Sequence, residues 1–286
     1  MSSKRYNESY NFDAPDADVI LVTGGGYPTE IRAHRCVLIA ASPFFRDVFS
    51  LPQPPSIPSY SPSTSDAHIP RIPISETRDV FTKLLSYVYP IPRPIINSLD
   101  EVSVLLGAAL KYDFITAVEV LRGMLVSQRY LVENPLRVYG IATSFDLEDE
   151  AKIASRYTLN INLLDAPLCD EMRHISAYSY QKLINLHRTR AKAASELIKP
   201  PRSLKCPSCN SCGHGLYGSP KWWNEFANKA KAELAIRPTT EGIFDNMEFL
   251  KSTCSSGCPR CPMSLLEAGP LLMDLKKQID ELPSTI

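Results

Sequence analysis

Apolar residues near the start of the chain recur with the period of two that is typical of strands. Val19–Val22 is a short apolar run, residues 29–32 alternate around Ile31, and a glycine turn lies between them. Residues 69–74 alternate again and contain prolines, which an edge strand tolerates. The pattern therefore predicts a small sheet made of a hairpin and an edge strand.

Between and after these strands the apolar spacing changes to three and four residues, which predicts helices. Residues 34–41 and 43–49 form two such segments, and the serine–proline pair at their junction is typical of a helix N-terminus. Residues 80–89 form a third segment. The stretch before it, residues 51–73, is rich in proline and serine and is expected to be a loop.

Beyond residue 98 the spacing is helical and continues to Ile198. Residues 107–114 and 140–147 resemble each other, since both end a helix with an aromatic residue, an aspartate and an apolar residue in the same order. Both stretches predict a helix, a tight turn and a second helix. The expected fold class is α+β, with a short sheet flanked by helices first and an all-α region after it.

The balance of charged residues indicates which class of partner the chain can bind. The 286 residues carry 31 Lys and Arg against 31 Asp and Glu, so the formal net charge is zero. The two signs also nearly balance within residues 1–128, 129–200 and 201–286. No segment has the basic excess that contact with a phosphate backbone requires, which argues against nucleic acid and favours protein partners.

The N-terminal residues are polar, so we expect no secretory signal, and no apolar stretch is long enough to cross a bilayer. The expectation is a protein without membrane contact that is intracellular, in the nucleus or the cytoplasm. Thiols stay reduced there, so clustered cysteines predict a metal site rather than disulfides.

Six of the eight cysteines lie between residues 206 and 261. Two Cys-x2-Cys pairs can place four thiolates tetrahedrally around one zinc ion. The expected zinc ligands, which form two pairs of equal spacing, are Cys209, Cys212, Cys258 and Cys261. The alternates are Cys206, His214 and Cys254. A set of Cys206, Cys209, Cys254 and Cys258 stays open, as does a reduced cysteine cluster without metal.

A zinc ion held by four thiolates has no open position for a substrate water, so the expected zinc is structural. A helix with Trp222, Trp223 and Phe226 is predicted between the cysteine groups, and residues 265–282 predict a final amphipathic helix. That last helix is expected to pack on the cysteine module, with partner binding as the alternative. Since no spacing suggests a nucleophile and base, we expect no catalytic residue, no organic cofactor and no enzyme.

One block of sequence is specific enough to identify a family. It runs from His34 to Phe45 as HRCVLIAASPFF, follows the run DVIL that begins at Asp18, and precedes a helical segment that ends at Tyr89. With this block, residues 16–127 resemble a BTB/POZ domain. The structural signature positions of the resemblance are Asp18, His34, Phe44, Phe45 and Tyr89.

The resemblance implies a protein-interaction module that commonly forms a homodimer. Some family members also recruit a cullin scaffold for ubiquitin transfer, using an apolar-x-Glu motif after the second helix. Residues 51–55, LPQPP, hold no glutamate there, and Tyr-Pro-Ile at 89–91 replaces the Tyr-Thr-Gly that often closes the next helix. A cullin scaffold is therefore a partner whose motif is not matched.

The whole chain is similar to fungal proteins that carry one BTB domain, a helical middle and a C-terminal cysteine-pair module, and this likeness also favours the two pairs given above as zinc ligands. The expected domains are a disordered N-terminus at 1–15, a BTB/POZ domain at 16–127, a BACK-like helical region at 128–200 and a cysteine-rich helical module at 201–286. The main hypothesis is an interaction protein that dimerises or serves as an adaptor. The alternatives are a substrate adaptor of a cullin-based ubiquitin ligase and a zinc-dependent DNA-binding transcriptional regulator.

Overall fold

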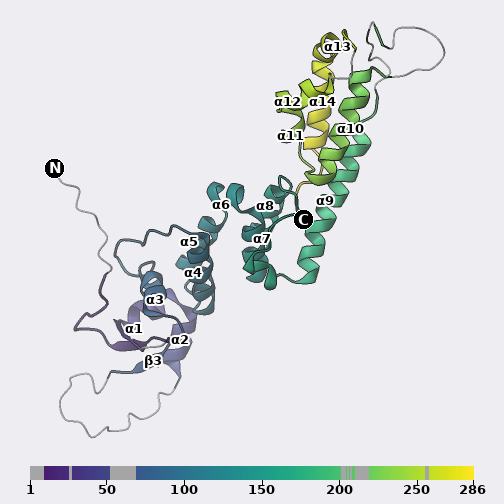
Figure 1. The fold of residues 1–286 in the computed structure, drawn as a ribbon. Helices are drawn as coiled ribbons and strands as arrows, with labels where there is room; N and C mark the ends of the chain where they lie inside the picture. Colours follow the sequence, from purple (N-terminus) through teal and green to yellow (C-terminus); the bar gives the residue numbers. More distant parts are fainter. Residues whose placement is uncertain are drawn as a thin grey trace, which may run out of the picture. The chain divides into compact units, whose positions relative to one another are not determined.

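The structure is a computed structural model. It describes residues 10–25, 28–51, 69–200, 204, 206, 208–209, 219–254 and 258–286. The chain divides into two compact units, Met1–Ser127 and Gln128–Ile286, and each is described by itself (Figure 1). Most of the predicted proline-rich loop, together with Cys212 and His214, lies outside the described residues.

The first unit contains a three-stranded sheet in the order β2-β1-β3. The strands are β1 (Val19–Val22), β2 (Glu30–Ala33) and β3 (Arg71–Pro73). β2 is antiparallel to β1 and β3 is parallel to it. The first three residues of β1 are fully buried, as a central strand requires, and β3 takes the edge position that tolerates its proline.

Helices complete the first unit, and the predicted α+β class is confirmed. The described helices are α1 (Arg35–Ala41), α2 (Pro43–Ser50), α3 (Arg78–Leu85), α4 (Leu99–Lys111) and α5 (Ile115–Leu125). α2 begins where the sequence predicts, because the Ser42 hydroxyl accepts a hydrogen bond from the Phe45 N–H at 3.0 Å. The same hydroxyl donates to the Tyr112 carbonyl at 2.6 Å and so ties α2 to the end of α4.

Aromatic rings fill the core of this unit. Phe45, Phe81 and Phe114 are fully buried, and Tyr112 is nearly so. The ring of Phe45 stacks on Tyr112 at 5.8 Å between centroids and lies 5.7 Å from Phe114. Phe81 meets Tyr112 edge-on at 5.3 Å. This cluster packs α2, α3 and the α4–α5 turn against one another.

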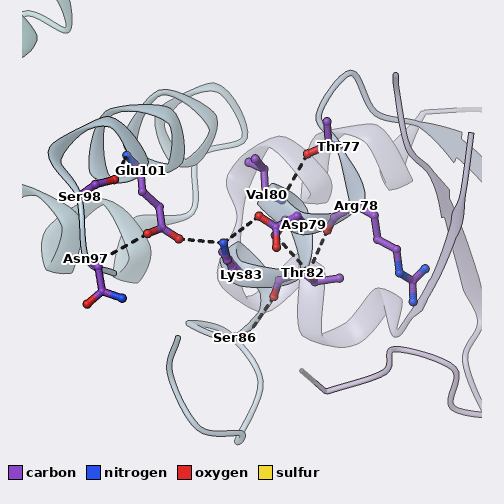
Figure 2. A network of polar contacts seen from close by, with 10 residues as sticks. All are labelled: Thr77, Arg78, Asp79, Val80, Thr82, Lys83, Ser86, Asn97, Ser98 and Glu101. Carbon is purple, nitrogen blue, oxygen red and sulfur yellow. Dashed lines mark hydrogen bonds and ion pairs between the residues drawn. The ribbon is translucent and has the colours of Figure 1, made fainter. Parts of the chain in front are cut away.

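A polar network joins α3 to α4 at the surface (Figure 2). The Lys83 ammonium lies 2.7 Å from an Asp79 carboxylate oxygen on α3 and 2.8 Å from a Glu101 oxygen on α4. The Ser98 hydroxyl accepts from the Glu101 N–H and caps α4. The two carboxylates raise the pKa of Lys83, and this effect outweighs the opposing effect of burial.

The described residues of the second unit form helices joined by turns and loops, with no strand among them. Its elements are α6 (Gln128–Glu133), α7 (Pro135–Ser144), α8 (Glu148–Thr158), the 3-10 helix η1 (Asp170–Arg173), α9 (Ala177–Leu197), α10 (Lys221–Ile236), α11 (Glu241–Phe244), α12 (Met247–Thr253), α13 (Cys261–Glu267) and α14 (Gly269–Asp280). α9 packs against α10 and α14, so the helical middle and the cysteine-rich segment share one core. Among the helices that the structure describes, none is both long enough and apolar enough to cross a membrane.

The predicted final helix is in fact two helices. α13 begins at Cys261 and ends at Glu267, and α14 starts at Gly269. Pro270 has no N–H to donate to the Leu266 carbonyl, so one helical hydrogen bond is missing where the two helices meet.

The two turns that resemble each other in sequence also share their backbone geometry. Asp113 between α4 and α5 has φ of 50°, and Asp146 between α7 and α8 has φ of 55°. The next N–H, of Phe114 or Leu147, donates to a carbonyl five residues earlier at 2.9 or 2.8 Å. Aspartate tolerates this left-handed conformation better than most residues, so the prediction of two equal turns is confirmed.

Residues 10–15, which belong to the terminus that the sequence predicts to be disordered, are among those described. Phe12 is buried, and its ring meets Tyr89 edge-on at 5.3 Å. The Phe12 carbonyl accepts a hydrogen bond from the Arg32 N–H of β2 at 3.0 Å. Residues 1–9 lie outside the described part of the chain.

Candidate metal centre

The polar signature positions of the first unit all have hydrogen-bond partners. An Asp18 carboxylate oxygen accepts the Arg35 N–H at 2.7 Å and so caps the start of α1. The Tyr89 hydroxyl oxygen accepts the His34 backbone N–H at 2.9 Å, and it lies 3.2 Å from the His34 Nδ1. Burial raises the pKa of Tyr89 to about 12, so the phenol stays protonated at neutral pH. These contacts connect the start of α1 to Asp18, beside β1, and to Tyr89.

The two aromatic signature positions lie at the start of α2. Phe45 is the centre of the aromatic core described above, and Phe44 meets it edge-on at 5.3 Å. Phe44 also contacts Tyr112 at 5.3 Å. Both rings therefore serve the packing of the first unit.

The second unit brings four thiols together. The Sγ atoms of Cys206, Cys209, Cys258 and Cys261 all lie within 4.8 Å of one another. The Cys206–Cys258 sulfur distance is 3.7 Å and the Cys209–Cys261 distance is 3.8 Å. A disulfide needs its sulfurs about 2.05 Å apart, so these pairs are not bonded.

The distances fit a tetrahedral zinc ion. Zinc binds thiolate sulfur at about 2.3 Å, and two ligands of a regular tetrahedron of that size are about 3.8 Å apart. The two sulfur pairs match that spacing. Four sulfur donors also suit zinc rather than calcium or magnesium, which prefer oxygen. The residues present therefore fit a four-thiolate zinc site.

Short sequence segments position the two halves of the cluster. Cys261 is the first residue of α13, and Cys258 lies in the turn that leads into it. The Arg260 N–H donates a hydrogen bond to the Cys258 sulfur, and the Cys261 N–H donates to the Cys258 carbonyl at 3.3 Å. On the other half, the Cys209 sulfur accepts the Lys221 N–H at 3.4 Å, at the start of α10. N–H groups directed at thiolate sulfurs stabilise their negative charge.

The thiols belong to the apolar core of the unit. Cys206 and Cys261 are fully buried, and they share a cluster with Trp222, Trp223 and Phe226 of α10. The Trp222 indole N–H donates to the Ser264 hydroxyl at 3.0 Å, which connects α10 to α13. A metal ion at this place would therefore lie beside the core that α10 and α13 share.

The local environment gives the thiols of the cluster different pKa values. The N–H of Arg260 lowers the pKa of Cys258 to about 7, whereas burial raises the pKa of Cys261 to about 12. Burial also raises the pKa of Cys209. The thiols of Cys209 and Cys261 would thus each lose a proton as the site takes up zinc, because zinc binds the deprotonated form.

The structure places three of the four expected ligands, Cys209, Cys258 and Cys261, in the cluster. The fourth thiol there belongs to Cys206, which the sequence analysis keeps as an alternate. Cys254 is described and its thiol is not part of the group. Cys212 and His214 lie outside the described residues, so their expected roles stay predictions.

Sequence spacing alone could not choose between Cys206 and Cys212. Cys206 and Cys212 each lie three residues from Cys209, so either pair has the Cys-x2-Cys form. The supporting groups, Ser264 and the Lys221 N–H, carry no sequence signal of their own. They become visible only when α10 and α13 are packed together.

Comparison with protein families identifies the domain type of the first unit. Residues 8–129 match the model of the BTB/POZ domain. No curated protein sequence matches the chain. The matched stretch contains the sheet, α1 to α5 and the signature positions, and the cysteine cluster lies outside it. Residues 8–129 of this chain are therefore a BTB/POZ domain, a module for protein–protein interaction.

Proposed function

We propose that this chain is a non-enzymatic interaction protein that dimerises through its BTB/POZ domain and is held together in its second unit by one structural zinc ion. The proposed ligands are Cys206, Cys209, Cys258 and Cys261. The observation that carries the zinc proposal is the approach of four thiols to within 4.8 Å inside an apolar core.

A structural role follows from the donor set and its surroundings. Four thiolates complete the tetrahedron, so no position is left for a substrate or an activated water. The ion would link the segment before α10 to the start of α13, two parts of the chain that are far apart in sequence. Such a cross-link stabilises the folded unit in the same sense as a disulfide, but it requires reduced thiols. We therefore place the protein inside the cell, in the nucleus or the cytoplasm.

The homodimer is supported by the BTB/POZ match, because domains of this family commonly pair with a second copy. A dimer would present two copies of the zinc-containing unit to its protein partners, as an adaptor does. Recruitment of a cullin is the weaker alternative, because residues 51–55 and 89–91 depart from the motifs that the family uses. DNA binding is weaker too, since the charges balance in the zinc-containing segment.

Native mass spectrometry with and without a chelator tests both parts of the proposal. The expected species has twice the 31.9 kDa chain mass plus two zinc ions. Mild chelation should remove the zinc without dissociating the dimer, because the BTB/POZ domain lies in the other unit. A monomer would contradict the dimer, and a metal-free chain purified with zinc present would contradict the zinc site.

Single cysteine variants identify the ligands. Cys206→Ser should abolish zinc retention, and Cys169→Ser, a change to a thiol outside the cluster, is the matched control. Cys212→Ser separates the two candidate quartets. Zinc retained in Cys212→Ser and lost in Cys206→Ser supports the proposed ligands, and the reverse result contradicts them.

A further inference from the structure

An apolar stripe lies exposed on the last two helices of the second unit. Met263 and Leu266 of α13 are 61% and 74% exposed, and Met273 of α14 is 69% exposed. Pro270 between them is also exposed. We call Met263, Leu266, Pro270 and Met273 the α13–α14 stripe; it belongs to the yellow end of the chain in Figure 1.

The spacing of the stripe is that of a helix-binding seam. Its members are separated by three, four and three residues, which is the spacing of a coiled-coil seam, here shared by two helices that meet at Ala268. The next position of the repeat is Lys277, which is exposed and lies 3.9 Å from Glu281. The same two helices already bury a second set of positions with similar spacing, among them Cys261, Leu272 and Leu275. The helices are thus apolar on two faces, and the inner face alone accounts for their packing in the unit.

One edge of the stripe carries a row of negative charges. Glu267, Asp274 and Glu281 follow one another at intervals of seven residues, and all three are exposed. In a helix pair these positions flank the seam and face the flanking positions of the partner helix. Glu281 has an ion-pair partner, Lys277 at 3.9 Å, and Asp274 accepts a hydrogen bond from the uncharged Gln278 at 2.7 Å.

The opposite edge carries little charge. Its positions, in the same repeat, are Pro262, Gly269 and Lys276. Lys276 is already ion-paired with Asp280 at 3.1 Å and with Asp245 at 3.6 Å. The stripe is therefore bordered by acid on one side and by nearly neutral residues on the other.

From this arrangement we propose that the α13–α14 stripe docks a basic amphipathic helix of a protein partner. The apolar face of that helix would cover Met263, Leu266 and Met273, and its lysines or arginines would face the acidic row. Methionine side chains adapt their shape to different neighbours, which suits a docking surface. The charge on the edge selects the partner by attraction and rejects acidic helices by repulsion.

A second copy of the same stripe is a poorer occupant. In an antiparallel pair the acidic row would face itself, which is repulsive. In a parallel pair the row would face Pro262, Gly269 and Lys276, and that lysine already has two carboxylate partners. The charges therefore favour a different helix over self-association.

Fluorescence anisotropy with two synthetic helical peptides tests the proposal on the full chain. Both peptides carry leucines at seam positions; one has lysines at the flanking positions and the other has glutamates. The lysine peptide should bind at least about tenfold more tightly than the glutamate peptide. The difference should shrink at about 0.5 M salt, because the charged edge is exposed.

Variants locate the binding surface. Leu266→Lys should weaken binding of the lysine peptide by at least about tenfold, and Leu168→Lys, a change at another exposed leucine of the same unit, should leave it unchanged. The double change Glu267→Lys with Asp274→Lys should reverse the preference between the two peptides. A circular dichroism melt of each variant verifies that it is folded.

Equal binding of both peptides would overturn the proposal, as would no binding of either. Binding that Leu266→Lys does not reduce would place the peptide elsewhere and would overturn it too. Sedimentation of the full chain gives one further outcome: a species larger than the dimer that Leu266→Lys dissociates would show that a second copy covers the stripe, and would also overturn the proposal.

Discussion

The two units differ in what holds their cores together. The BTB/POZ unit has a three-stranded sheet and a core cluster of aromatic rings centred on Phe45. The second unit surrounds Trp222 and Phe226 with four thiols that lie as close as 3.7 Å. The first core packs aromatic rings against one another, whereas the second holds four thiols at the spacing that the proposed zinc ion requires. Two units of one chain can therefore have stabilities that respond to different conditions.

The largest expected effect comes from removing one of the proposed zinc ligands. Cys261→Ser should lower the free energy of unfolding of the second unit by more than about 5 kcal/mol, since structural zinc contributes on the order of 10 kcal/mol. Both tryptophans of the chain lie in that unit, so tryptophan fluorescence during denaturation reports on it alone. Cys36→Ser in the first unit is the control. An unchanged fluorescence transition in Cys261→Ser would break the comparison.

A cavity in the core of the first unit should destabilise that unit and leave the second unchanged. Phe45→Ala should destabilise the BTB/POZ unit by about 3–5 kcal/mol, because a fully buried ring that contacts five other aromatic rings is removed. Circular dichroism should show an earlier transition while the tryptophan fluorescence transition and the zinc content stay as they were. A loss of zinc in this variant would mean that the two cores depend on each other.

Acid should act on the second unit through His187 of α9. This residue is 8% exposed, its Nε2 lies 3.1 Å from the Thr158 hydroxyl, and burial lowers its pKa to about 4. The pKa of histidine in an unfolded chain is about 6.5. Between pH 6.5 and pH 4 the unfolded chain therefore binds a proton that the folded unit does not. The neutral, buried His187 therefore contributes to the free energy of unfolding above about pH 6.5. This contribution, up to about 3 kcal/mol, is lost as the pH falls toward 4.

The variant His187→Gln isolates this contribution, because glutamine can keep the bond to Thr158 without taking up a proton. The denaturation midpoint, followed by tryptophan fluorescence from pH 7 to pH 4, should fall less steeply in His187→Gln than in the original chain. Acid also weakens zinc binding, and that effect is common to both proteins and cancels in the difference. Equal slopes would contradict the assignment.

The smallest effect is expected at the polar network of the first unit (Figure 2). Lys83→Met removes ion pairs with Asp79 and Glu101 but keeps the aliphatic part of the side chain. Because all three groups are partly exposed, the loss should stay below about 1 kcal/mol and should shrink further in salt. Thermal denaturation at low and high salt measures it. A loss as large as that of Phe45→Ala would show that charge, and not apolar packing, dominates this core.

Local signals were enough to predict most of the helices and all three strands. The serine–proline pair at Ser42 marks the start of α2, and prolines mark β3 as an edge strand. The paired turns at Asp113 and Asp146 were predictable because the same short sequence occurs twice. The break between α13 and α14 was missed, although Pro270 was the signal for it.

The cysteine site could be predicted as a cluster but not as a set of four. Cys206 and Cys212 have equal spacing to Cys209, so the choice depends on how α10 packs against the start of α13. The exposed apolar stripe on α13 and α14 was equally hard to predict. A window that scores hydrophobicity finds one face of an amphipathic helix, and it does not reveal that the other face is also apolar until burial is known.

The paired turns have a consequence for engineering. Residues 107–114 and 140–147 produce the same left-handed aspartate and the same backbone hydrogen bond, although one turn is packed against an aromatic core and the other lies in a helical bundle. The backbone path is thus encoded locally and does not depend on its surroundings. The turn is a transplantable connector, and it offers a ready-made loop for joining antiparallel helices in a designed protein.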